Sequence, residues 1–161
     1  MIFNPHAGGM QRGGRKIEFI SDSLRALGVE LQLLSTRAPG DATILARRLV
    51  ESECPLVVAC GGDGTINEII CGMAGSHVPL MIFPGGTANV LSNQIGLPKD
   101  LRHCVQLLRT GSLRRITLGK AGARHFAVMA GIGVDAGVVK AVDPALKRKI
   151  GQGAFWLAKQ Y

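Results

Sequence analysis

Apolar side chains recur at intervals of three or four residues in several parts of the chain, the pattern of amphipathic helices. The first stripe ends before Gly28, a residue type that commonly terminates helices. That stripe consists of Ile17, Ile20, Leu24 and Leu27. A second helix is predicted over residues 42–50, with Asp41 as its N-cap. Two more helices are predicted over residues 65–72 and 101–110.

Other apolar runs have the length of strands. Residues 29–34 alternate between apolar and polar positions, whereas residues 55–60 and 78–83 are almost continuously apolar, as in parallel strands buried on both faces. Residues 1–3 form a further, very short apolar run. Strands and helices therefore alternate, which predicts an α/β fold: a parallel sheet with helices on both faces.

The pattern changes near the end of the fourth helix. Residues 114–118 and 125–130 have strand character with no helix between them, which indicates an antiparallel unit. We therefore predict an α/β domain over residues 1–112. Residues 113–161 are predicted to be the beginning of a second, antiparallel β-rich domain, which is incomplete.

Composition narrows the class of protein. Hydrophobic residues make up 47% of the 161-residue chain, enough for a buried core, and the net charge is +8. A basic balance favours anionic partners such as nucleotide phosphates or acidic phospholipid surfaces, although it also fits an ordinary solvated surface. Nucleic acid is not predicted as a partner, because no segment interleaves aromatic with basic residues.

Cysteine spacing and hydropathy indicate where in the cell the protein is expected. The four cysteines show no metal-binding spacing, so the sequence predicts reduced thiols in a cytoplasmic protein rather than a zinc site. No apolar stretch reaches the ~18 residues of a membrane span. Any membrane contact is therefore predicted to be peripheral, at the inner membrane surface.

Two glycine-rich loops follow two of the predicted strands. Residues 61–65 read Gly-Gly-Asp-Gly-Thr, and residues 84–89 read Pro-Gly-Gly-Thr-Ala-Asn. Glycine lets backbone N–H groups approach a phosphate, and the N-terminus of the following helix adds partial positive charge. Because ligands bind at the carboxyl edge of open α/β sheets, the two loops together predict a phosphate-binding site.

Asp63 is the acidic residue of the first loop, and its sequence context leaves more than one interpretation open. A carboxylate beside phosphates is repelled unless a cation bridges them or the carboxylate transfers a proton, which favours a role with Mg²⁺ or in catalysis. Alternatively, Asp63 forms a turn that holds the loop. Thr65 and Glu68 have the spacing of a capping box, which predicts Thr65 as the N-cap of the next helix.

Three motifs, in order, resemble the signatures of the diacylglycerol kinase catalytic-domain family, which includes bacterial soluble lipid kinases and sphingosine kinases. They are Asn-Pro-His-Ala-Gly at residues 4–8, Gly-Gly-Asp-Gly-Thr-Ile-Asn-Glu at residues 61–68, and the loop at residues 84–89. The Gly-Gly-Asp-Gly-Thr loop alone is shared with NAD kinases and phosphofructokinases. The specificity of the resemblance therefore comes from the three motifs together.

This resemblance implies a fold like that of NAD kinases and diacylglycerol kinases, and an ATP site. It implies that Thr36 contacts ATP, that Glu68 braces the site, and that Asn4 holds or contacts the nucleotide loop. Asp63 is then the catalytic residue of this chain and its candidate Mg²⁺ ligand. The implied nucleotide-binding residues are Asn4, Thr36, Gly61, Gly62, Asp63, Gly64, Thr65, Ile66, Asn67, Glu68, Gly86, Thr87 and Asn89.

The chain departs from the family in two respects. The residue after Asn89 is often acidic in the family and is Val90 here, and the family's general base lies in a second domain, beyond the position that matches Tyr161. The implied function is transfer of the ATP γ-phosphoryl group to a lipid hydroxyl at a membrane surface, with this chain as a fragment that lacks the base. The alternatives are a non-catalytic nucleotide-binding remnant and a soluble-substrate kinase of the NAD kinase type.

Overall fold

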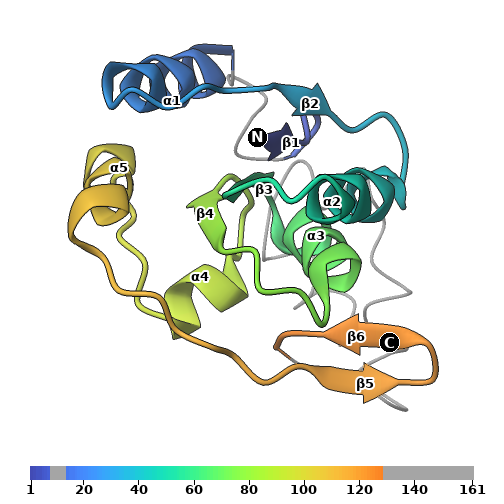
Figure 1. Cartoon of the computed structure of the whole chain (residues 1–161). Helices are drawn as coiled ribbons and strands as arrows, with labels where there is room; N and C mark the ends of the chain where they lie inside the picture. Colours follow the sequence, from blue (N-terminus) through green and yellow to red (C-terminus); the bar gives the residue numbers. More distant parts are fainter. Residues whose placement is uncertain (8–13, 129–161) are drawn as a thin grey trace, which may run out of the picture. The chain divides into compact units, whose positions relative to one another are not determined.

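The computed structural model describes residues 1–7 and 14–128, which lie within one compact unit. Its main element is a parallel sheet with strand order β2-β1-β3-β4 (Figure 1). The strands are β1 (Ile2–Phe3), β2 (Leu34–Ser35), β3 (Val57–Gly61) and β4 (Leu80–Pro84). The helices are α1 (Gly14–Ala26), α2 (Asp41–Glu51), α3 (Asp63–Met73), α4 (Val90–Gln94) and α5 (Leu101–Thr110). The predicted α/β class with a parallel sheet is confirmed.

The sheet separates two hydrophobic clusters, because successive strand residues point to opposite faces. In β3, Val57 and Ala59 belong to the cluster that contains the buried residues of α2 and α3. Val58 and Cys60 belong to the cluster that contains those of α1 and α5. Figure 1 shows these two helix pairs on opposite sides of the strands. All of β3 is buried, as predicted for a central strand covered on both faces.

The strand β2 is shorter than its sequence pattern suggests. The prediction of a strand over residues 29–34 is wrong for most of its length, because β2 begins at Leu34. Among the described strands it pairs with β1 alone, in the register Ile2 to Leu34 and Phe3 to Ser35. Since β1 has two residues, it can form a ladder with only two residues of its neighbour. Periodicity describes which side chains are apolar, whereas strand length also depends on the partner strand.

Helices α2 and α3 approach each other closely. A Cβ atom on Gly72 would lie 2.4 Å from the carbonyl oxygen of Thr43 and 2.9 Å from the Cβ of Ala46, so no larger residue fits without movement. The Thr43 hydroxyl also donates a hydrogen bond to the carbonyl of Glu68 at 3.0 Å. The small residues thus set the spacing of the two helices that cover one face of the sheet.

Helix α1 ends in a Schellman motif. The N–H of Gly28 donates to the carbonyl of Arg25 at 2.8 Å, and the N–H of Val29 donates to the carbonyl of Leu24 at 3.1 Å. Gly28 has φ 78, the left-handed conformation that this motif requires. The predicted end of the first helix at Gly28 is therefore confirmed. Helix α4 ends in the same way, with Gly96 at φ 73.

Helix α2 ends in the same motif without a glycine. The N–H of Glu53 donates to the carbonyl of Val50 at 3.0 Å, and the N–H of Cys54 donates to the carbonyl of Leu49 at 3.1 Å. Glu53 stands at the position that glycine holds in the other two helices, and its φ is 53. A side chain with a Cβ in this conformation costs free energy.

A hairpin follows the fourth strand and the fifth helix. The strands β5 (Gly119–Ala121) and β6 (Arg124–Phe126) are antiparallel, and β6 contacts α3, where the Cys71 thiol donates to the carbonyl of His125 at 2.9 Å. The antiparallel character that the sequence predicts is confirmed. The predicted strand over residues 114–118 is wrong, because the chain there is irregular and pairing begins at Gly119, under the ring of Phe126.

Most of the predicted second domain lies outside the described residues. The predicted strand over residues 125–130 overlaps β6 only to residue 126, and residues 129–161 are not described. The division into domains of residues 1–112 and 113–161 therefore stays a prediction. In the part of the chain that the structure describes, no helix is both long and apolar enough to cross a membrane.

Candidate functional site

The four parallel strands end at one edge of the sheet, and the predicted site begins there. Phe3, the last residue of β1, pairs with both Ser35 and Cys60, so these strands end nearly level. The residues that follow the four strands are Asn4, Thr36, Gly62 and Gly85. The topology thus brings together motifs that are far apart in the sequence, at the edge where open α/β sheets bind ligands.

The two glycine-rich loops pack directly on each other at this edge. The N–H of Gly85 donates to the carbonyl of Gly61 at 2.8 Å. A Cβ atom on Gly86 would lie only 2.5 Å from the Cα of Gly62. Glycine at position 86 is therefore required by the contact between the loops, whether or not a ligand is present, whereas a Cβ on Gly62 would lie 3.3 Å from the Cα of Gly86 and is merely tight.

The first turn of α3 differs from the capping-box prediction. The N-cap is Gly62 and the helix begins at Asp63, so the prediction of Thr65 as N-cap is wrong. The extended backbone of Gly62 lets the helix begin earlier. The Thr65 hydroxyl instead accepts a hydrogen bond from the amide Nδ2 of Asn4 at 3.2 Å. Since the N–H of Asn4 donates to the carbonyl of Cys60 at 3.1 Å, Asn4 joins β1, β3 and α3.

The carboxylate of Asp63 connects the two loops. Its Oδ1 accepts a hydrogen bond from the N–H of Val90 at 2.6 Å, and Val90 is the first residue of α4. Asp63 therefore caps the helix that follows the second loop, a role that the sequence does not indicate. Among the described residues, its second oxygen, Oδ2, accepts no hydrogen bond.

Gly64 is the glycine of the first loop that the fold does not explain. It is exposed, its φ lies outside the left-handed region, and no described atom lies within 4 Å of a Cβ built on it. The N–H groups of Asp63, Gly64 and Thr65 have no acceptor in the described part of the chain. Unpaired N–H groups at a helix N-terminus, open to solvent, are suited to an anion.

The second loop is held by the amide side chains of Asn89, its last residue, and of Asn93 on α4. Asn89 has φ 48, and its side chain accepts from the N–H of Gly86 at 2.8 Å and donates to the Gly86 carbonyl at 2.9 Å. Asn93 Nδ2 donates to the carbonyl of Ala88 at 2.8 Å. Thr87 lies between these anchored residues and is exposed, so it is the side chain of this loop that is presented to solvent.

The loop after β2 contributes Thr36, which is 8% exposed. The prediction of Asp41 as the N-cap of α2 is wrong, because Gly40 is the N-cap and Asp41 is the first helical residue. The Asp41 carboxylate instead accepts hydrogen bonds from the N–H groups of Arg37 at 2.8 Å and Ala38 at 3.0 Å. These two bonds lower the pKa of Asp41 and hold the loop beside Thr36.

Three more predicted residues continue along α3. Ile66 is 1% exposed, its side chain lies in the core, and its N–H donates to the carbonyl of Gly62 at 3.0 Å. The Asn67 amide lies 3.9 Å from the thiol of Cys71, and Glu68 is partly buried. The side chain of Ile66 is thus part of the core, whereas Asn4 bonds to Thr65 and Asp63 bonds to Val90 at the loop edge.

Sequence reasoning missed Asn93 and the N–H group of Val90. Neither belongs to the three motifs at residues 4–8, 61–68 and 84–89, and helix α4 is too short to show a helical period. The available signal was the pair of asparagines four residues apart, since asparagine favours turns and left-handed conformations. Within residues 1–7 and 14–128, no three His, Cys, Asp or Glu side chains gather into a metal site.

The fold and the site define a parallel α/β domain in which two interlocked glycine loops and an open helix N-terminus occupy the carboxyl edge of the sheet. Residues 1–121 match the family model described as "Diacylglycerol kinase catalytic domain". The chain therefore belongs to the diacylglycerol kinase catalytic domain family, as its three motifs predict.

Curated relatives and solved structures agree with this assignment. The diacylglycerol kinase of Staphylococcus saprophyticus is 31% identical over 159 residues, which are 98% of this chain and 52% of the relative. That of Bacillus subtilis is 30% identical over 160 residues, with the same two coverages, 98% and 52%. A crystal structure of a diacylglycerol kinase from Bacillus anthracis has a TM-score of 0.75 and 31% identity, and the match covers 98% of this chain and 52% of that one. The chain thus spans about half the length of the curated relatives it matches.

Proposed function

We propose that this chain supplies the ATP-binding half of a lipid kinase that transfers the γ-phosphoryl group of ATP to the hydroxyl of a diacylglycerol-like lipid. One observation carries the proposal: in a member of the diacylglycerol kinase catalytic domain family, Asn4, Thr36 and both glycine loops stand at one edge of the sheet. Curated relatives that match almost the whole chain are diacylglycerol kinases.

The nucleotide phosphates would lie against the first turn of α3. The N–H groups of Asp63, Gly64 and Thr65 offer donors, and the absence of a side chain at Gly64 leaves space above them. Thr87, exposed on the second loop, offers a hydroxyl from the other side. The hydrogen bond between Asn4 and Thr65 orients the first turn, so Asn4 acts by holding the loop.

The residues present also fit Mg²⁺ as a companion of ATP. Mg²⁺ prefers oxygen ligands and is usually bound by one or two carboxylates together with substrate phosphates. Asp63 Oδ2 is a carboxylate oxygen of this kind, since the other oxygen of the same group is engaged by Val90. When bound, the ion would offset the repulsion between phosphates and carboxylate. Asp63 would then both hold the ion and cap α4.

The proposal names the lipid acceptor only by class, as a diacylglycerol-like lipid at a membrane surface. The net charge of +8 favours an anionic surface, and we propose peripheral contact with the cytoplasmic face of a membrane. Because the chain spans about half the length of its relatives, a second candidate is a unit that binds nucleotide without transferring phosphate. Nucleotide binding and phosphate transfer are therefore tested separately.

The first experiment changes charge at Asp63 while keeping its shape. Asp63→Asn retains an oxygen that can accept from Val90, so the loops stay joined, but the negative charge is lost. The matched control is Asp100→Asn, since Asp100 also caps a helix, accepting from the N–H of Arg102 at 2.7 Å on α5. We expect Asp63→Asn to weaken Mg-ATP binding by the chain at least tenfold, and Asp100→Asn to leave it unchanged. Equal affinities for both variants would refute the role of Asp63 with the ion.

Phosphate transfer is measured with labelled Mg-ATP and lipids in mixed micelles. Two proteins are compared. One is this chain, and the other is a longer protein that contains this chain and has the full length of the curated relatives. Labelling of diacylglycerol by the longer protein, abolished by Asp63→Asn, would support the lipid kinase proposal. Labelling of a water-soluble acceptor such as NAD instead would overturn it. ATP binding without labelling of any acceptor would favour the second candidate.

A further inference from the structure

The second glycine loop is fixed by bonds that come from outside it. Its last residue, Asn89, is left-handed at φ 48, a conformation that costs about 1–2 kcal/mol for a residue with a Cβ atom, somewhat less for asparagine. Two hydrogen bonds, which we call anchors, keep the backbone around Asn89 in this conformation. Asp63 accepts from the N–H of Val90 at 2.6 Å, and Asn93 donates to the carbonyl of Ala88 at 2.8 Å.

The two anchors act on opposite sides of Asn89. Val90 follows Asn89 and Ala88 precedes it, so together they fix the peptide units on both sides of the left-handed residue. Asn89 itself then closes the turn onto Gly86 with bonds of 2.8 and 2.9 Å. If the Ala88 carbonyl were released, this peptide unit could rotate and the turn would lose its shape.

We infer that Asn93 is a positioning residue for the nucleotide site, which acts through the Ala88 carbonyl to present Thr87 and the Gly86 backbone. The inference rests on the proposed function, because it assigns a nucleotide to this edge. Asn93 lies outside the three motifs, on the exposed side of α4, and its side chain has no other hydrogen bond in the described residues. Its side chain therefore serves the loop rather than the core.

The adjacent residue provides a matched control. Gln94 is also exposed, also lies in the last turn of α4, and its side chain makes no hydrogen bond in the part of the chain that is described. Asn93→Asp and Gln94→Glu each replace an amide by a carboxylate at neighbouring positions. They therefore have the same effect on net charge and nearly the same effect on the helix dipole. Only Asn93→Asp removes the donor to Ala88 and places an acceptor against its carbonyl.

The first measurement is the dissociation constant of Mg-ATP for the unaltered chain and both variants, with thermal unfolding recorded in the absence of nucleotide. Loss of one neutral hydrogen bond changes an equilibrium by about three- to tenfold. We expect Asn93→Asp to weaken binding by about that factor and Gln94→Glu to change it less than twofold, with similar unfolding temperatures for both. If the two variants bind Mg-ATP equally well, the inference is overturned.

The second measurement does not depend on nucleotide. Hydrogen exchange of the Gly86 and Val90 amides reports whether the turn is held, because both N–H groups bond to side chains. Exchange should be faster in Asn93→Asp than in Gln94→Glu, and equal exchange would overturn the inference even if no protein bound ATP. Absence of ATP binding by the unaltered chain would instead count against the proposed function. Faster exchange with unchanged ATP affinity would also overturn the inference, because Asn93 would then stabilise the turn without affecting nucleotide binding.

Discussion

Glu53 occupies a position where its own side chain is unfavourable. It is the left-handed residue of the Schellman motif that ends α2, at φ 53, and it repeats the hydrogen bonds that surround Gly28 at the end of α1. Its side chain is exposed and makes no hydrogen bond among the described residues. Replacing Glu53 by glycine therefore removes strain without removing a contact.

The size of the effect follows from two opposing contributions. A residue with a Cβ pays about 1–2 kcal/mol in the left-handed conformation. Glycine loses more backbone entropy on folding, which offsets about 0.5–1 kcal/mol of that gain. Glu53→Gly should therefore raise the free energy of unfolding by about 0.5–1 kcal/mol. For a chain of this size that corresponds to a rise in Tm of about 1–4 °C.

Urea denaturation is the appropriate assay, because a higher midpoint with an unchanged slope reports stability rather than a change in compactness. The control is Glu51→Gly, which makes the same substitution two residues earlier, in the last helical residue of α2. There the backbone is helical, so glycine should lower stability by up to about 1 kcal/mol. If Glu53→Gly lowers stability as Glu51→Gly does, the strain argument is refuted.

Four further outcomes are expected. Gly64→Ala should leave stability unchanged or raise it by up to about 1 kcal/mol, because no described atom crowds the new methyl group. The same substitution should weaken Mg-ATP binding severalfold, as measured by calorimetry, and unchanged binding would contradict a phosphate site there. Gly72→Ala should lower stability by about 1–3 kcal/mol in the same urea assay, because the methyl group meets the Thr43 carbonyl. Burial raises the pKa of Cys60 to about 12, so brief iodoacetamide treatment at neutral pH should leave this thiol unmodified by mass spectrometry until the protein is unfolded. The two N–H groups that donate to Asp41 lower the pKa of its carboxyl below the ordinary value of 3.8. The stability that the ionised Asp41 contributes is therefore present above pH 3.8 and is lost as the pH falls through the lower pKa of the folded state. In urea titrations, the free energies of unfolding of Asp41→Asn and of the unaltered chain should become equal in acid.

Helices α1, α2, α3 and α5 and the strands β3 and β4 follow from the sequence because their signals are local. Apolar spacing within one turn of a helix and the continuous apolar run before Gly61 do not depend on distant residues. The two errors in strands arose where a distant partner decides the structure. The length of β2 depends on β1, and the start of the hairpin depends on the fit of Gly119 under Phe126 and on its contact with α3.

The candidate site shows the same division. The two glycine loops and their common edge could be predicted, since parallel strands place their carboxyl ends together. The hydrogen bond from Val90 to Asp63 could not, because the two residues are 27 positions apart and the donor is a backbone group that any residue carries. The capping box failed for a related reason: Gly62 supplies a cap with no side chain, so the helix begins earlier than the side-chain pattern indicates.

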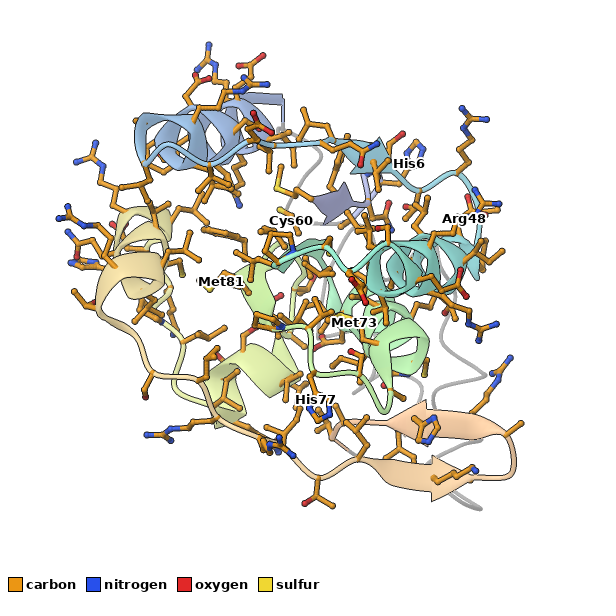
Figure 2. All side chains as sticks on the ribbon, in the orientation of Figure 1. His6, Arg48, Cys60, Met73, His77 and Met81 are labelled. Carbon is orange, nitrogen blue, oxygen red and sulfur yellow. The ribbon has the colours of Figure 1, made fainter. Side chains whose placement is uncertain are left out.

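The central position of β1 has a consequence for how the protein is made on the ribosome. Ile2 pairs with Ala59, and positions 2 and 59 are 57 residues apart. At a synthesis rate of about 5–20 residues per second, β3 is translated about 3–11 s after β1. During that interval the apolar residues of β1 stay available to chaperones or to wrong partners. Figure 2 labels Cys60, which pairs with Phe3 of β1, and Met81 on the neighbouring strand β4. Sheet formation on the ribosome therefore depends on the emergence of β3.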